Sequence, residues 1–408
     1  MVLYLVLFPD IKVGVYPFIN SDEKWIFHTV INKSSIRVQI AIVPYLAPME
    51  HTFSYDQLYK FTNAVFIAMG CSAIDAATAT KVLLSADVRG IDSHGVARLT
   101  GYVRLWEARR INATPHIKIV HETPSTAVVD GDAGLGLVVA PFAMQVAIDK
   151  AANVGTGWVS VRNSNHFGIA GYHAMMALSH DMIGISMTNA SALVAPTFSV
   201  ERMLGTNPIA VAIPAGKQPP FVADFATTTA ANGKLEILQR KHGAAPEGWV
   251  QDAAGHTSTD ANELKKGGAL LPLGSDREHG SHKGYALGSI VDIFSAVLSG
   301  ASYGPWAPPF PAYVPMPANM PGTGLGHFFG AMRTDAFRSV DEFKEHMDNW
   351  ITRFRHAKPA PGHEKVLIPG DPERVMEAIR MKEGIPVVES VVDELKSVGE
   401  RFRIDLFN

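Results

Sequence analysis

Two histidines lie in short polar segments that combine proton transfer with recognition of an acid. His94 lies in Asp92-Ser93-His94-Gly95, and Arg98 comes four residues after it. His166 lies in Arg162-Asn163-Ser164-Asn165-His166-Phe167-Gly168. Imidazole exchanges protons near neutral pH because its ordinary pKa is roughly 6.5, and guanidinium forms paired hydrogen bonds with a carboxylate. These residue types predict proton-transfer chemistry on a small organic acid.

Each histidine also has a purely structural alternative. Taken alone, His94 is typical of a capping or core histidine, and His166 of a loop histidine bonded to the asparagines beside it. The neighbours of His94 favour function, because Ser93 is able to fix its ring by a hydrogen bond. If a helix starts near Arg98, Tyr102 lies on the same face of that helix.

A metal site is the main alternative to this chemistry. His279 and His282 are three residues apart beside Asp276 and Glu278, and the chain has 16 histidines. Zinc-binding pairs on a helix usually have a spacing of four, and Gly280 argues against a helix here. We predict no metal, and a metal-dependent hydrolase that uses His279 and His282 stays as the alternative.

The segment Gly131-Asp132-Ala133-Gly134-Leu135-Gly136 lies where a dinucleotide loop would lie, between a predicted strand and a predicted helix. Its order is G-x-x-G-x-G instead of G-x-G-x-x-G, and no clear acid follows at the end of the next strand. A simple turn is therefore favoured over a phosphate cradle, and the pattern does not support a Rossmann domain. Lys283, followed by Gly284, is the better candidate for a cation beside a cofactor phosphate or ribose.

Alternating helix and strand patterns predict an α/β core. A capping box at Ser54 begins the first helix, and the segment of His166 follows a strand, where α/β proteins place ligands. The other expected helices are 75–88, 141–152 with Pro141 in first position, 170–179, a buried helix through 290–297, and two that start at 339 and 371. The expected strands are 127–130, 158–161, 182–187 and 221–224. We expect a long surface excursion at 244–269 and a loop or lid at 300–326, which is rich in Pro and Gly.

Composition narrows the class of protein. The chain has 408 residues, 47% of them hydrophobic and 18% charged, which predicts a large core and a soluble globular protein. The net charge of -3 gives no drive toward nucleic acid or an anionic membrane, so we expect neither partner. The lone Cys71 forms no internal disulfide, which favours a reducing compartment, and we interpret the protein as cytoplasmic.

Seven motifs in unbroken order resemble the malate/L-lactate dehydrogenase family of the non-Rossmann type, which also includes sulfolactate, ureidoglycolate and diketogulonate enzymes. The resemblance covers about residues 50 to 400. The motifs are Ser93-His94-Gly95 with Arg98, Asn165-His166-Phe167-Gly168, Gly184-Ile185-Ser186-Met187-Thr188-Asn189, Gly205-Thr206-Asn207-Pro208, Asp224-Phe225-Ala226-Thr227, His282-Lys283-Gly284-Tyr285 and Pro361-Gly362-His363.

The resemblance implies a fold and an activity. It implies NAD(P)-dependent hydride transfer between a small malate- or lactate-like 2-hydroxy acid and its 2-oxo acid, in a homodimer. We favour NAD, with NADP as the alternative, because no Arg cluster is evident. The implied architecture is α/β, with a non-Rossmann NAD(P)-binding sheet domain packed with a helical domain built from N- and C-terminal segments. A relative that binds cofactor without turnover is a further alternative.

The implied domains are a helical N-terminal part at 49–125, a cofactor-binding α/β domain at 126–310, and a lid loop with C-terminal helices at 311–408. Residues 1–48 fall outside the resemblance and are an extension of doubtful status. We suspect that Met49 is the functional start, which N-terminal sequencing of native protein would decide.

The resemblance also implies roles for particular residues. His166 matches a proton acceptor in some members of the family, and His94 matches a proton donor in others. We assign proton removal to His166 and orientation of the substrate hydroxyl to His94, with the exchanged roles as the alternative. The substrate-binding residues predicted on this basis are Arg98, Tyr102, Ser93, Thr206 and Asn207. The predicted cofactor-binding residues are Thr188, Asn189, Ala190, Asp224, Phe225, Ala226, Lys283, Gly362, His363 and Glu364.

Overall fold

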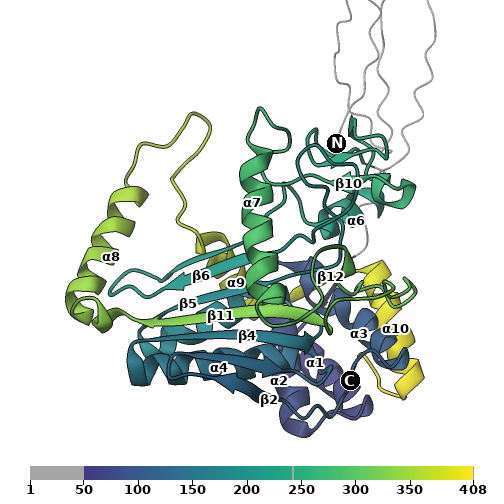
Figure 1. The fold of residues 1–408 in the computed structure, drawn as a ribbon, viewed down its shortest axis with the longest axis horizontal. Helices are drawn as coiled ribbons and strands as arrows, with labels where there is room; N and C mark the ends of the chain where they lie inside the picture. Colours follow the sequence, from purple (N-terminus) through teal and green to yellow (C-terminus); the bar gives the residue numbers. More distant parts are fainter. Residues whose placement is uncertain (1–49, 241–242, 408) are drawn as a thin grey trace, which may run out of the picture. The chain divides into compact units, whose positions relative to one another are not determined.

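The computed structural model describes residues 50–240 and 243–407 (Figure 1). The predicted extension 1–48 and the suspected start at Met49 lie outside the described residues. The part of the chain from His51 onward forms one contact unit, and the fold is described for this unit.

A seven-stranded sheet forms the centre of this unit, with the strand order β2-β3-β4-β11-β5-β6-β7. The strands are β2 (Lys118–Glu122), β3 (Thr126–Asp130), β4 (Thr156–Ser164), β5 (Met182–Thr188), β6 (Ile209–Ile213), β7 (Phe221–Phe225) and β11 (Leu325–Arg333). Among these strands, β3 and β4 are the one parallel pair, and the other neighbours run antiparallel. A doubly wound dinucleotide fold needs a mostly parallel sheet, so the expectation of a non-Rossmann α/β fold is confirmed.

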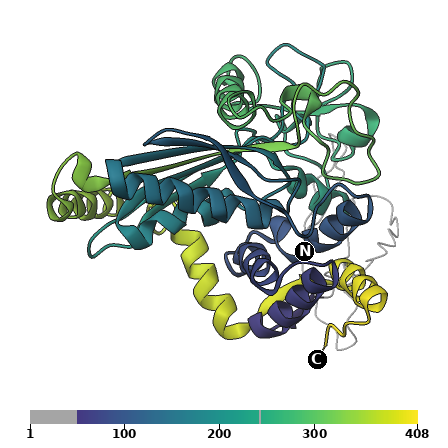
Figure 2. The ribbon, with the colours of Figure 1, turned by 60° about the horizontal axis from the view of Figure 1, so that its bottom comes forward.

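Helices cover both faces of this sheet (Figure 2). On one face lie α4 (Gly136–Val154) and α5 (Ala170–Met175), which pack on Val159 and Val161 of β4. On the other face lies α7 (Ser281–Asp292), which continues as a π-helix, Ile293–Val297. There Ser160 of β4 donates a hydrogen bond to the carbonyl of Phe294 at 3.2 Å. Neighbouring strand residues point to opposite faces, which explains the contrast between Ser160 and the valines beside it.

Within the described ranges, α4 is the one helix long and apolar enough to cross a membrane. Half of its apolar stretch is buried in the protein, where its alanines and Met144 pack against the sheet. The core helix of a globular protein has the same composition.

Segments from both ends of the described chain share a second apolar core (Figure 2). Its elements are β1 (Glu50–Phe53), α1 (Tyr55–Ala68), α2 (Ala73–Val88), α3 (Leu99–Glu107), β12 (Ile385–Val388) and α10 (Glu389–Phe402). Phe61 and Phe66 of α1 are almost fully buried there, and burying such a side chain contributes about 1.5–3 kcal/mol. The capping box at Ser54 is present as predicted. A helical region built from N- and C-terminal segments is thus confirmed, while the boundaries at 125 and 310 stay predictions.

The segment 244–269 is not the surface excursion that we expected. It forms a small sheet of β8 (Val250–Gln251), β9 (Thr257–Ser258) and β10 (Ala269–Leu270). Val250 and Leu270 pack with Leu235 of α6 (Asn232–Arg240) in a third apolar core. Its few apolar residues are spread among Gly, Asp and Thr, so no periodic pattern revealed them.

Two further helix predictions need correction. Pro141 is not the first residue of its helix, because α4 begins at Gly136 and continues through the proline. Residues 137–140 are buried, and this burial outweighs the hydrogen bond that proline cannot make. The helix through 290–297 is not buried: Ile290 and Ile293 are 44% and 49% exposed.

The helix expected at 170–179 is α-helical only to Met175, as α5, and Met176–His180 forms a 3-10 turn. The other predictions of elements are confirmed. The strands expected at 127–130, 158–161, 182–187 and 221–224 lie within β3, β4, β5 and β7. The last two helices are α8 (Val340–Arg355) and α9 (Asp371–Glu383). Residues 300–324 form an irregular loop with one short 3-10 turn, and the last two residues of the expected loop belong to β11, which begins at Leu325. The 3-10 turns are Asp92–His94, Val96–Arg98, Met176–His180, Glu263–Lys266, Gly304–Trp306 and Thr334–Ala336.

Candidate active site

The turn that carries His94 follows the end of α2 and is held by side chains of α2 and α9. Ser93 Oγ lies 2.9 Å from His94 Nδ1, as the sequence predicted. The buried carboxylate of Asp87 accepts the backbone N–H of Val96 at 2.9 Å. Arg380 of α9 donates to the carbonyl of Asp87 and to the carboxylate of Asp92. The turn is therefore fixed at both ends by charged groups.

His166 lies on the segment that leaves β4, and this segment packs against the glycine-rich turn. The side-chain amide of Asn165 donates to the carbonyls of Ala133 and Gly134, at 2.9 Å each. A Cβ at Gly136 would lie 2.1 Å from the carbonyl oxygen of Asn165 and 2.5 Å from that of His166. The turn 131–136 thus supports the backbone of His166, and the absence of a side chain at Gly136 permits this close approach.

The fold brings the two histidines together from separate elements. Their ring centroids are 5.7 Å apart, with 26° between the ring planes. The hydroxyl of Tyr102, on α3, lies 2.6 Å from Nδ1 of His166. Nδ1 of His166 therefore has a protein partner, and its Nε2 is the nitrogen left for a bound molecule.

The environment keeps both imidazoles neutral at physiological pH. Burial lowers the pKa of His94 to about 4, with a smaller contribution from the positive charge of Arg98. Burial also lowers the pKa of His166 well below its usual value, and His94, Arg98 and His327 add to this effect. Burial raises the pKa of the Tyr102 hydroxyl, which therefore stays protonated. A neutral imidazole is able to accept a proton, as a general base must.

Phe310, from the Pro- and Gly-rich loop, completes this group and was missed in the sequence. Its ring lies 4.9 Å from that of His166 and meets Tyr102 edge-on at 5.5 Å. Arg98 Cζ lies 5.9 Å from the same ring centroid, within the range of a cation–π contact. A Cβ at Gly101 would lie 2.5 Å from Phe310. A glycine inside an otherwise regular helix was the one signal that another group packs there.

The loop that carries Phe310 is held in place by hydrogen bonds on both sides. Ser191 Oγ accepts the backbone N–H of Phe310 at 2.9 Å. Arg110, just after α3, donates to the carbonyl of Pro309. The aromatic side chain is therefore positioned by its own backbone as well as by ring contacts.

Arg98, the predicted acid anchor, has two protein partners. Its Nε donates to the carbonyl of Ser93 at 2.6 Å, and its Nη2 lies 3.3 Å from Oε2 of Glu236 on α6. The guanidinium remains 20% exposed. Nothing in the sequence indicated Glu236, because 138 residues separate it from Arg98.

The two other predicted substrate residues differ in their freedom to bind. Asn207 is fully buried: its Oδ1 accepts the N–H of Ala190 at 3.1 Å, and its Nδ2 donates to the carbonyl of Gly288 at 2.9 Å. The side chain of Thr206 is half-buried and makes no hydrogen bond within the described residues. Thr206 is therefore the one of the two that has a side chain available to a ligand.

The predicted cofactor segment at the end of β5 uses its side chains internally. Thr188 Oγ1 lies 2.7 Å from Nδ1 of His327 and also reaches the carbonyl of Gly326. Asn189 is fully buried and donates to the carbonyl of Ser302 at 2.8 Å. Any contact of this segment with a cofactor would have to come from backbone atoms or from Ala190.

The other predicted cofactor residues are more open. Asp224 is exposed, and its Oδ2 accepts the N–H of Gly171 at 2.7 Å. Next to it, Phe225 is 42% exposed, and Ala226 follows. Lys283 is exposed in the first turn of α7, without a side-chain partner among the described residues. These three residue types are able to contact hydroxyls, an aromatic base and a phosphate, but Asp224 contacts α5 whereas Lys283 lies on α7, on the other face of the sheet.

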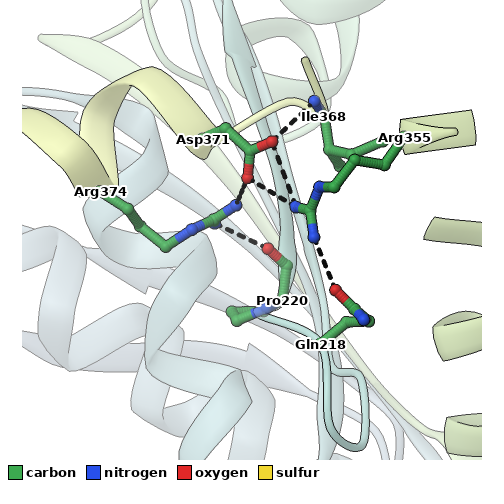
Figure 3. A network of polar contacts seen from close by, with 6 residues as sticks. All are labelled: Gln218, Pro220, Arg355, Ile368, Asp371 and Arg374. Carbon is green, nitrogen blue, oxygen red and sulfur yellow. Dashed lines mark hydrogen bonds and ion pairs between the residues drawn. The ribbon is translucent and has the colours of Figure 1, made fainter. Parts of the chain in front are cut away.

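The segment that carries Gly362, His363 and Glu364 is exposed, but both of its ends are fixed (Figure 3). Asp371, the first residue of α9, accepts from Arg355 at 2.9 Å and from Arg374 at 2.6 Å. The same arginines donate to the side chain of Gln218 and to the carbonyl of Pro220. The middle of the segment makes no side-chain contact with the two histidines.

The proposed metal pair does not converge. His279 lies before α7 and contacts Asp276 at 2.7 Å, whereas His282 lies inside α7 and contacts Arg277 at 3.1 Å. The sequence argument that Gly280 opposes a helix here is wrong. Gly280, with φ 97°, is the N-cap residue of α7, which begins directly after it at Ser281. In the described part of the chain, no group of three or more His, Cys, Asp or Glu side chains could hold a metal ion.

Comparison with known proteins gives a consistent result. The family model "Malate/L-lactate dehydrogenase" matches residues 53–396. A malate dehydrogenase of Pyrococcus abyssi is 44% identical over 85% of this chain and 93% of its own length. An L-sulfolactate dehydrogenase of Methanocaldococcus jannaschii is 38% identical over 85% of this chain and 96% of its own.

Solved structures agree with this sequence match. A malate dehydrogenase of Pyrococcus horikoshii superposes with a TM-score of 0.79 at 39% identity, covering 87% of this chain and 97% of that one. A malate dehydrogenase of Entamoeba histolytica superposes with a TM-score of 0.81 at 33% identity, covering 88% of this chain and 99% of that one. This chain therefore belongs to the malate/L-lactate dehydrogenase family and is a hydroxyacid dehydrogenase.

Proposed function

We propose that this enzyme oxidises a small 2-hydroxy acid, with malate as the first candidate, to the 2-oxo acid with NAD. The observation that carries the proposal is the stacked pair His94 and His166, 5.7 Å apart, beside the partly exposed side chain of Arg98. The pair supplies proton transfer and the guanidinium supplies carboxylate binding. The malate dehydrogenases among the relatives support malate as the first acid to test.

His166 takes the substrate hydroxyl proton at Nε2. The hydroxyl of Tyr102 contacts Nδ1 at 2.6 Å and is able to donate to it or accept from it. For Nε2 to accept this proton, the neutral ring must hold its hydrogen on Nδ1 and donate it to Tyr102, and the same bond stabilises the ring once it is protonated. His94, held by Ser93, orients the substrate hydroxyl, and Arg98 holds the carboxylate.

The described residues fit a nicotinamide cofactor. As support, exposed Asp224 and Phe225 and the cation of Lys283, which has no side-chain partner among the described residues, would hold ribose, base and phosphate groups. When bound, the cofactor supplies the hydride-transfer chemistry, and the protein supplies binding and orientation. NADP is the alternative to NAD, and a relative that binds cofactor without turnover is the alternative to the activity.

The first test is absorbance of the reduced nicotinamide while purified protein receives NAD or NADP with malate, lactate, sulfolactate or ureidoglycolate. Signal with one pair would establish the acid and the cofactor together. Cofactor binding without signal for any acid would contradict the activity and favour the inactive relative.

We also propose that the enzyme is a cytoplasmic homodimer. The support for the dimer is the exposed apolar surface on α7 and the π-helix that follows, formed by Ile290, Ile293, Phe294, Val297 and Leu298, each 41–60% exposed. An apolar surface of this kind is typical of a protein–protein interface. Sedimentation of the purified protein tests the dimer, and a monomer at micromolar concentration would contradict it.

A further inference from the structure

The contacts of Arg98 divide its guanidinium into an edge used by the protein and an edge left free. Nε and Nη2 form one edge of the planar group, and these two atoms contact the carbonyl of Ser93 and the carboxylate of Glu236. Arginine has five N–H donors, so three remain. The free edge, formed by Nη1 and Nη2, still matches a carboxylate with two parallel hydrogen bonds.

Glu236 is itself fixed, so its charge has a defined place. Asn232, in the first turn of α6, donates to its Oε1 at 2.8 Å, while Oε2 faces Arg98 at 3.3 Å. The N-terminal turn of α6 approaches the His94 turn closely, because a Cβ at Gly233 would lie 2.5 Å from Cβ of Ser93. Gly233 thus allows α6 to bring a carboxylate to the acid anchor.

This arrangement places a negative charge directly beside the group that must bind an anion. We propose that Glu236 tunes specificity: it aims the free edge of Arg98 and lowers the affinity for a second anionic group, so that a dicarboxylate such as malate binds less tightly than it would without this charge. The inference rests on the proposed function, because it assumes that Arg98 binds the carboxylate. The substrate's own carboxylate meets one favourable and one unfavourable charge, and every further anionic group adds repulsion from Glu236.

The size of this effect follows from the distance and the solvent. Two unit charges about 8 Å apart in an effective dielectric of roughly 40 interact enough to change affinity about 5-fold. A high effective dielectric is appropriate because the Glu236 side chain is 35% exposed. We therefore expect a preference of several-fold, which salt weakens.

The test compares Glu236→Gln with Glu236→Asp and with a matched control, Glu122→Gln. Gln has nearly the same shape without the charge and keeps one acceptor oxygen, for either Asn232 or Arg98, whereas Asp keeps the charge. Glu122 pairs with Lys150 at 3.0 Å on β2 and is 58% exposed, so its variant removes an ion pair elsewhere. Calorimetry measures binding of oxamate, which has one carboxylate, and of tartronate, which has two; turnover of lactate and malate with NAD is measured alongside.

In Glu236→Gln we expect the affinity ratio of tartronate to oxamate to rise about 5-fold, and this ratio should keep its wild-type value in Glu236→Asp and Glu122→Gln. An unchanged ratio in Glu236→Gln, or no binding of either acid by the wild type, would overturn the proposal. A raised ratio in an enzyme that turns over neither acid would support the role of Glu236 and contradict the proposed activity. Turnover of either acid together with an unchanged affinity ratio in Glu236→Gln would support the proposed activity and contradict the role of Glu236.

Discussion

The predicted acid–base residues and the predicted cofactor residues differ in how many of their side chains have partners within the described residues. Around His94 and His166, the side chains of Ser93, Tyr102, Phe310 and Arg98 all have partners. Lys283 and the segment 362–364 are exposed and lack side-chain partners among the described residues. The acid–base end is thus preorganised for the proposed chemistry, whereas the predicted cofactor residues are open to solvent.

The largest effect should come from the centre of the preorganised end. His166→Ala should lower kcat at least about 100-fold, the usual scale for the loss of a general base. His121→Ala, an exposed histidine on β2, is the matched control and should keep full turnover. Steady-state kinetics with the best acid measures both. Near-normal turnover in His166→Ala would remove its role as proton acceptor.

A smaller effect should follow from changing the acid anchor. Arg98→Lys should raise KM for the acid about 30-fold and change kcat less, because a single ammonium cannot contact Ser93, Glu236 and a paired carboxylate together. Arg104→Lys, on the exposed side of α3, should leave both constants unchanged. An unaltered KM in Arg98→Lys would mean that the carboxylate binds elsewhere.

Removing one hydroxyl tests how far the partners of His166 matter. Tyr102→Phe should lower kcat/KM about 10-fold, because His166 loses the group 2.6 Å from Nδ1 that stabilises its protonated ring. It should also move the acid limb of the pH profile, which a merely structural change would not do. Tyr59→Phe on α1 is the control. Identical pH profiles for Tyr102→Phe and wild type would exclude this positioning role.

Among the predicted cofactor residues, the effects should be smaller and confined to the cofactor. Lys283→Ala should raise KM for NAD about 5-fold and leave KM for the acid unchanged, because an exposed cation contributes modestly to phosphate binding. Lys265→Ala, another exposed lysine, should change neither. If Lys283→Ala raises KM for the acid instead of KM for NAD, Lys283 does not belong to a separate cofactor-binding end of the site.

The preorganised end should also resist acid. A general base works in its neutral form, which prevails above its pKa, and burial lowers the pKa of His94 to about 4 and that of His166 well below its usual value. We therefore expect kcat/KM for oxidation to stay nearly constant from pH 7.5 to about 5.5. A roughly 10-fold fall centred near pH 6.5 would indicate an ordinary, solvated histidine.

Local patterns in the sequence were sufficient for several elements and contacts. The capping box at Ser54 and the bond from Ser93 to His94 join residues close in sequence, so spacing alone revealed them. The failure of the glycine pattern correctly excluded a Rossmann domain. The motif resemblance identified the family and the histidines.

Tertiary structure decided what brings distant residues together. Phe310 and Glu236 reach the site from a loop and a helix far along the chain, and no periodicity predicts where such segments pack. The same reason explains the error at α7: its apolar residues predicted burial, but only the packed fold shows that they lie on the surface. The sequence alone thus determined the reactive groups and the local elements, because both depend on neighbours in the chain. Packing determined their partners, their pKa values and their exposure, because these depend on contacts between distant segments.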